Sequence, residues 1–348
     1  MVYFVSYFLL LFATYIGRHG AEVQKILYYF FLFFLFCFSG FRYEVGCDWK
    51  VYNVIFDYDS AVYAFRDGGS LEIGYYLTMI WLKKFGLGFQ ALNIITSGLF
   101  FLGLHAIAKR EKYPLLILAL AFPFLIINLP MSGIRQGAAF GLLAFAFLSF
   151  IDRRFLRFLF FTLLATSFHS SAILFFLLAP MYFFKFNLRN SIIAAALISP
   201  ILISIYLSSF GLIAQERYIQ GDLSSFGAYF RISIIFLIAL YFLFFMRKKW
   251  VELFPKDYEF ILMGAIGIVL TTLIILPIST VIADRLGFYL WFFVLIILGR
   301  AISIPSRLRE LSVIGSILGL FFAFTFWTQN SPYFYQCYVP YNFQFTIY

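Results

Sequence analysis

Residues 88–154 read GFQALNIITSGLFFLGLHAIAKREKYPLLILALAFPFLIINLPMSGIRQGAAFGLLAFAFLSFIDRR. This stretch holds three apolar runs, at about 88–108, 113–129 and 137–151, with short polar or helix-breaking segments between them. Each run approaches the roughly 20 residues that a helix needs to cross a bilayer. The stretch therefore predicts three membrane-spanning helices in succession.

The same pattern continues in both directions from this stretch. The chain is 63% hydrophobic and only 12% charged, whereas soluble domains carry roughly a quarter of charged residues. The apolar runs are continuous, not alternating, which argues against a β-barrel. The predicted spans lie near 1–17, 26–40, 88–108, 113–129, 137–151, 191–209, 228–246, 260–282, 286–302 and 311–328. We expect an all-α, polytopic membrane protein with about 10–12 transmembrane helices, forming a single transmembrane domain over residues 1–348.

Two further apolar stretches look too short or too interrupted to cross the membrane. The first, 71–85, carries Lys83 and Lys84, and the second, 158–184, is interrupted by SFHSS at 167–171. Both are interpreted as half-buried or re-entrant elements, and the second equally fits a tight pair of tilted spans.

The charged loops predict the orientation of the chain. The basic runs KREK (109–112), DRR (152–154), RKK (247–249) and SRLRE (306–310) share one side if the N-terminus lies outside, as the positive-inside rule requires. Topology therefore explains the net charge of +10, and we expect no nucleic-acid partner. Residues 1–16 lack a basic leader and are read as a retained span. The outer face then holds a loop at 41–70, a loop at 210–227 and the tail 329–348.

The first outer loop combines charged and aromatic residues. Arg42, Glu44 and Asp48 stand close to Trp49 and Tyr52 in FRYEVGCDWKVY. Aromatic faces beside carboxylates suit a sugar, which offers apolar ring faces and hydroxyl groups. An ordinary interfacial loop with belt aromatics explains the same composition.

Three polar residues beyond this loop reach the same face. Arg135 follows Pro130 and Gly133 at the head of a span, where an arginine is costly and its planar fork suits phosphate; the alternative is a snorkelling side chain. His169 lies at the break in 158–184. It could act as a base or donate a hydrogen bond to phosphate, and the alternative is a packed histidine with no role in the site. Glu72 begins the short helix at 71–85, where it either serves the site or complements the helix N-terminus.

The later outer segments add further arginines. Arg217 and Tyr218 lie in the loop 210–227, and Asp284 and Arg285 are placed at a hairpin between two spans, either in the site or as a structural pair with each other. Several arginines on one face, without an acidic pair for metal, fit a phosphate or pyrophosphate held by protein charge alone. The sequence predicts no metal and no cofactor, and the cysteines show no CxxC spacing.

Six motifs resemble those of one family. FRYEVGCDWKVY resembles the arginine–glycine–aspartate–tyrosine signature in the first outer loop of EpsG-family proteins. LEIGYYL, GIRQGAAFG, FHSSAILF, ERY and DRLGFYL resemble later elements of that family in the same order. In the family a small hydroxyl residue usually precedes the aspartate and a tyrosine follows it, where this chain has Cys47 and Trp49. The topology allows a Cys47–Cys337 disulfide, but free thiols are the favoured interpretation.

The resemblance implies a Wzy-like polymerase of O-antigen, capsule or exopolysaccharide, related in architecture to GT-C-type glycosyltransferases. Its substrate would be an oligosaccharide on polyprenyl pyrophosphate at the outer face of the bacterial inner membrane, with membrane lipid, a chain-length regulator and a flippase as partners. The expected catalytic residues are Asp48, His169, Arg135 and Arg285. The expected substrate-binding residues are Arg42, Glu44, Trp49, Tyr52, Glu72, Gln136, Arg217, Tyr218 and Tyr289.

Other functions fit the same features less well. An O-antigen ligase and a single-sugar lipid-linked glycosyltransferase would use similar outer-face chemistry. A flippase is the alternative from another class, but transporters place polar residues near the midplane and show repeat symmetry, and neither is visible here.

Overall fold

The computed structural model describes residues 1–58, 72–187, 227–304 and 309–347, together with isolated positions between 188 and 227. The predicted span at 191–209 lies largely outside the described residues, and so do residues 59–71 of the first outer loop. Regular structure in the described part is helical apart from two short strands. The prediction of an all-α membrane protein is confirmed.

The chain divides into two compact units. Unit 1 comprises Met1–Phe145, Leu164–Ser170 and Leu298–Tyr348, and unit 2 comprises Ala146–Leu163 and Ser171–Ile297. Because both units draw on separate stretches of the chain, helices α8 (Ile134–Ile151), α9 (Phe155–Phe168) and α16 (Thr280–Ala301) each contribute residues to both.

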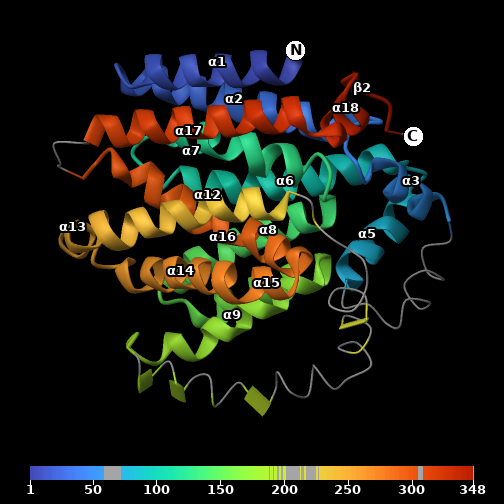
Figure 1. The fold of residues 1–348 in the computed structure, drawn as a ribbon. Helices are drawn as coiled ribbons and strands as arrows, with labels where there is room; N and C mark the ends of the chain where they lie inside the picture. The colour runs from blue at the N-terminus through green and yellow to red at the C-terminus, as the bar shows by residue number, and fades with distance from the viewer. Residues whose placement is uncertain are drawn as a thin grey trace. The chain divides into compact units, whose positions relative to one another are not determined.

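Unit 1 is built from apolar helices that pack side by side. Its elements are α1 (Val2–Gly17), α2 (Ala21–Gly40), β1 (Arg42–Tyr43), α3 (Trp49–Asp57), α5 (Ile73–Lys84), α6 (Phe89–Ala108), α7 (Pro114–Ala121), the π-helical turn η1 (Phe122–Ile126), the start of α8, α17 (Arg309–Asn330), α18 (Pro332–Tyr338) and β2 (Asn342–Phe343). Helices α1, α2, α7 and α17 form a neighbouring group (Figure 1).

Contacts at the two ends of α6 agree with the predicted orientation, in which successive loops of unit 1 lie alternately on the outer and the inner side. At the start of α6, the backbone N–H of Gly88 donates to the carbonyl of Ile347 in the predicted outer tail. Just beyond its other end, Glu111 of the predicted inner run KREK accepts hydrogen bonds from Arg300, from Nε to both carboxylate oxygens and from Nη2 to one of them. Predicted outer segments therefore meet at one end of α6 and predicted inner segments at the other.

The C-terminal segment is tied to the first outer loop. Strand β2 pairs antiparallel with β1, so that Arg42 lies opposite Phe343. Cys47 and Cys337 form a disulfide, with their Cα atoms 4.7 Å apart. The expectation of free thiols was wrong because the sequence does not reveal that these two segments pair, and pairing brings the cysteines within bonding reach.

Unit 2 contains the remaining helices. They are most of α9, the 3-10 helix η2 (Ser170–Tyr182), α12 (Ala228–Tyr241), the π-helical turn η4 (Phe242–Met246), α13 (Arg247–Leu253), α14 (Tyr258–Leu270), the π-helical turn η5 (Thr271–Ile275), α15 (Leu276–Ile278) and most of α16. The predicted interruption at 167–171 is observed, since α9 ends at Phe168 and η2 begins at Ser170.

The predicted hairpin at Asp284 and Arg285 was wrong. Ser279 is the residue between α15 and α16, with extended backbone angles, so that both charged residues lie inside α16. Pro277 lies near the C-terminal end of the continuous helical stretch Tyr258–Ile278, and the chain leaves the helix two residues later, at Ser279.

Six helical stretches of the described chain are long and apolar enough to cross a membrane. They are Ala21–Gly40, Phe89–Ala108, Ile134–Ile151, Ala228–Leu253, Tyr258–Ile278 and Thr280–Ala301. Shorter apolar helices of 10–17 residues accompany them. Helix α5 has 12 residues, about 18 Å of helix against roughly 30 Å of hydrocarbon, as its sequence suggested.

The disulfide can be tested by counting reactive thiols. The chain has three cysteines, of which Cys37 is free. We expect a maleimide–polyethylene glycol reagent to shift the denatured, unreduced protein by one step and the reduced protein by three. In Cys37→Ser the unreduced protein should not shift. Three steps without reductant would contradict the pairing.

Candidate functional site

A fully buried arginine organises the first outer loop in unit 1. Arg42 has 0% exposure, and its guanidinium donates to the carbonyls of Ser39, Val45 and Met131 and to the side-chain oxygen of Asn93. Burial lowers its pKa to about 10, which leaves it charged at neutral pH. The sequence analysis placed Arg42 among the substrate-binding residues. Because no edge of the buried side chain is open to a ligand, this geometry instead fits a residue that positions the loop.

The loop around Gly46 lies directly on the segment before α8. Gly46 has a φ of 105°, and a side chain there would overlap the carbonyl oxygen of Met131. Only glycine combines this backbone angle with so close an approach. As a result Asp48 is brought to Ser132, whose hydroxyl donates to the carboxylate at 3.1 Å. Asp48 itself is exposed.

Arg135 is held by one carboxylate and two tyrosines. Its Nη1 lies 2.5 Å from Oε2 of Glu72, and its Nε donates to the hydroxyl of Tyr52 at 3.4 Å. The guanidinium also lies over the rings of Tyr52 and Tyr75, at 5.4 and 5.7 Å from their centroids. Its side chain remains 31% exposed. The residue is thus a fixed and accessible cation, the arrangement that suits an anionic ligand.

Glu72 connects this arginine to the turn that contains His169. Its Oε1 accepts hydrogen bonds from the backbone N–H and the hydroxyl of Ser170, at 3.0 and 3.2 Å. Burial opposes the charged form of Glu72, but the charges of Arg135 and His169 and the Ser170 N–H outweigh it and lower the pKa of the carboxyl. His169, Glu72 and Arg135 therefore belong to one electrostatic cluster in unit 1.

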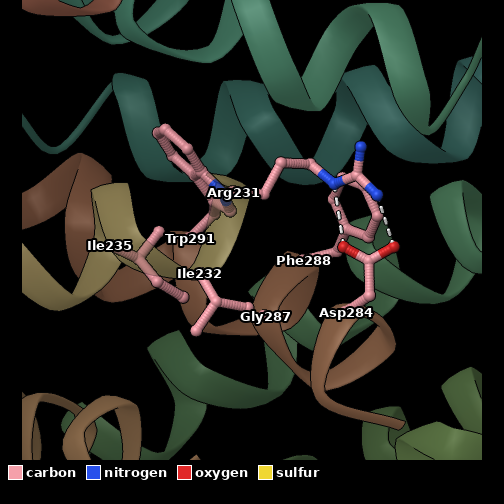
Figure 2. Close-up of a pocket in the computed structure, with 7 residues that line it drawn as sticks. All are labelled: Arg231, Ile232, Ile235, Asp284, Gly287, Phe288 and Trp291. Atoms are coloured by element: carbon pink, nitrogen blue, oxygen red, sulfur yellow. Dashed lines mark hydrogen bonds and ion pairs between the residues drawn. The ribbon is translucent and has the colours of Figure 1, made fainter. Parts of the chain in front are cut away.

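A second polar group lies in unit 2 and involves an arginine that the sequence analysis did not single out (Figure 2). Arg231 of α12 binds both carboxylate oxygens of Asp284, at 2.8 and 2.6 Å. Ser225 donates a further hydrogen bond to Asp284. The interpretation that Asp284 pairs with Arg285 was wrong, because neighbouring residues on a helix point about 100° apart.

The Arg231–Asp284 pair closes a small apolar crevice. Ile232, Ile235, Phe288 and Trp291 line it (Figure 2). The Arg231 guanidinium lies 5.4 Å from the Phe288 ring centroid. Both charged side chains are less than 15% exposed, so this group is best explained as a clamp between the starts of α12 and α16.

The remaining predicted site residues do not all lie beside Arg135. Trp49 is buried against Tyr43 and Phe89, and Tyr289 is buried in unit 2, where its hydroxyl accepts a hydrogen bond from Ser171. Glu44 is exposed, with a φ of 55°. Gln136 is buried beside Arg135 in α8. Arg217 and Tyr218 lie outside the described residues.

Several residues of the site escaped the sequence analysis. Tyr75, Ser132 and Ser170 carry no charge, so nothing in their local sequence distinguishes them from other tyrosines and serines. Arg231 did carry a signal, since it stands in the first turns of an apolar helix as Arg135 does. In the described residues no group of three or more His, Cys, Asp or Glu side chains is arranged to hold a metal ion.

The fold and the cluster define a multi-pass membrane protein with an arginine–carboxylate site at the ends of its helices. The model of the EpsG family matches residues 25–343, and the chain therefore belongs to the EpsG family. Membership implies a general role in polysaccharide polymerisation. No curated protein and no solved structure matches the chain.

The clamp in unit 2 predicts a large stability effect. Asp284→Asn should lower stability by about 3 kcal/mol, because it leaves a largely buried guanidinium without its counter-charge. Glu252→Gln changes an exposed carboxylate of α13 and should leave the melting temperature in detergent unchanged. Equal melting temperatures for the two variants would show that the pair is not a clamp.

The lowered pKa of Glu72 predicts a pH dependence. A carboxyl with a folded-state pKa below its usual 4.5 stabilises the protein fully above that pH and loses the effect as the pH falls through the folded-state value. The melting temperature difference between wild type and Glu72→Gln should therefore not shrink between neutral pH and about pH 4.5, and should shrink only below it. A difference that has vanished by about pH 6 would contradict the shift.

Proposed function

We propose that this protein polymerises polyprenyl-pyrophosphate-linked oligosaccharide repeat units on the outer face of the bacterial inner membrane. One observation carries the proposal: an accessible arginine, Arg135, and an exposed carboxylate, Asp48, are held in one unit by the same pair of loops. Family membership supports the polymer-forming activity in general.

The reaction needs a base and a stabilised leaving group. A hydroxyl of the acceptor glycan attacks the anomeric carbon of the first sugar on the donor chain, and the bond from that carbon to the pyrophosphate oxygen breaks. Asp48 takes the proton of the hydroxyl, with His169 as the alternative base. Negative charge grows on the departing polyprenyl pyrophosphate, and Arg135 stabilises it without a metal ion.

Other residues complete the proposal. Arg285, in unit 2, and Arg217 keep the leaving-group role that the family resemblance implies, as predictions to be tested by substitution. Tyr52 is buried and acts through the Arg135 that it holds. The exposed Glu44 is assigned to the sugar, and the lipid tail to the surface of the apolar helices. A flippase would deliver the substrate and a chain-length regulator would control the product.

The disulfide supports the compartment. Structural disulfides form and persist in oxidising compartments such as the periplasm. Cys47 directly precedes Asp48, and its partner Cys337 lies in the C-terminal segment. This pairing favours an outer position for the loop that carries Asp48, in agreement with the predicted orientation.

A deletion strain would separate this function from its alternatives. Loss of a polymerase leaves single repeat units attached to the final acceptor. Loss of an O-antigen ligase leaves polymer on the carrier lipid, and loss of a flippase traps repeat units inside. A single-sugar transferase would change the composition of the repeat unit, with its polymerisation unaffected.

Substitution of Arg135 tests the proposed mechanism. Arg135→Ala should abolish long glycan chains while single-repeat material and protein level persist, and Arg135→Lys should rescue poorly because its point charge lacks the planar fork. Arg285→Ala should behave like Arg135→Ala. Arg154→Ala, at an exposed arginine just before α9, is the matched control and should give a normal ladder on glycan gels.

The same substitutions can also contradict the proposed leaving-group role. Normal ladders in Arg135→Ala and Arg285→Ala, with protein present at the wild-type level, would remove both arginines from the leaving-group role.

A further inference from the structure

The carboxylate of Glu72 is shared between two parts of the chain. One oxygen binds Arg135 and the other accepts both hydrogen bonds of Ser170. Glu72 stands at the N-terminus of α5, yet its side chain does not cap that helix. The helix-capping explanation that the sequence allowed is therefore replaced by a link between the start of α8 and the turn after α9.

The position of Glu72 is fixed by its own helix. Gly74, two residues on, lies so close to Ser167 that a side chain at Gly74 would overlap the serine hydroxyl. The start of α5 is thus pressed against the end of α9. Since Glu72 is only 7% exposed, its carboxylate has little freedom to move away from Arg135.

This arrangement leaves one edge of Arg135 for a ligand. Nε faces Tyr52 and Nη1 faces Glu72, while no hydrogen bond from Nη2 to the described residues is found. The rings of Tyr52 and Tyr75 fix the plane of the guanidinium. Glu72 consequently sets the direction of the open edge, but its negative charge opposes an anion that approaches the same group.

We propose that Glu72 is a positioning residue, which aims Arg135 at the pyrophosphate of the substrate at the expense of affinity for that anion. This inference rests on the proposed function for its effect on turnover. Its effect on anion binding stands on the geometry alone.

The test compares anion affinity with turnover in Glu72→Gln. Inorganic pyrophosphate is titrated into the purified protein in detergent, and binding is followed by the rise in melting temperature. We expect Glu72→Gln to bind pyrophosphate roughly three- to tenfold more tightly, because a competing charge is removed. Polymer formation from a synthetic polyprenyl-pyrophosphate-linked repeat unit should fall roughly 10- to 100-fold, because the arginine is no longer aimed.

Two controls define the background. Arg135→Ala measures pyrophosphate bound elsewhere on this basic protein. Glu22→Gln removes an exposed carboxylate in the first turn of α2 and should match wild type in both measurements.

Glu72→Asp separates the effect of the negative charge from the effect of side-chain length. It also provides a test of the inference if Glu72→Gln does not fold. It keeps the carboxylate but shortens the side chain, so that affinity should stay within about twofold of wild type while turnover falls. Unchanged or weaker pyrophosphate binding in Glu72→Gln would overturn the inference, as would full turnover in either variant. Absence of polymer with the wild-type protein would instead refute the proposed function and leave the binding result to stand by itself.

Discussion

A guanidinium buried without a carboxylate beside it must be surrounded by other acceptors, and Arg42 imposes this requirement on unit 1. In the described residues its acceptors are three backbone carbonyls and one amide oxygen. These acceptors come from the end of α2, from the loop at Val45, from the segment before α8 and from α6. One side chain thereby fixes the loop that carries Asp48 against the segment that leads to Arg135. Asp48 and Arg135, two of the candidate catalytic residues, depend on it, although its own side chain is fully buried.

The long helices were predictable because a segment that crosses the hydrocarbon core must be long, apolar and helical, and the length and composition of a segment can be read directly from the sequence. Elements that depend on contacts between distant segments were not. Helix α3 lies in a stretch read as a loop, since its nine residues mix charges with aromatics. The C-terminal strand β2 pairs with a strand almost 300 residues earlier. No local sequence pattern indicates a pairing partner at that distance. For the same reason the sequence analysis favoured free thiols over the disulfide.

The candidate site was predictable as a set of charged residues but not as a set of bonds. Asp48, Glu72, Arg135 and His169 lie in one unit, as expected if the alternation of the predicted spans brings their segments to the same end of the helices. The contacts that define their roles come from Ser132, Ser170 and two tyrosines, whose sequence context is ordinary. For Asp284 the sequence suggested the wrong partner. The adjacent Arg285 points away from it on the same helix, and the observed partner is Arg231, 53 residues earlier in the chain.

Three of the arginine–carboxylate pairs in the described residues differ in how they use the guanidinium. Arg231 and Arg300 each engage a carboxylate through Nε and Nη2, with 14% and 16% of their side chains exposed. This bidentate geometry occupies one whole edge of the fork and suits a structural link. Arg135 gives its carboxylate a single nitrogen, turns Nε to a neutral tyrosine and keeps 31% exposure. An incoming anion can therefore add to Arg135 without first displacing Glu72, whereas at the other two pairs it would have to break a double hydrogen bond.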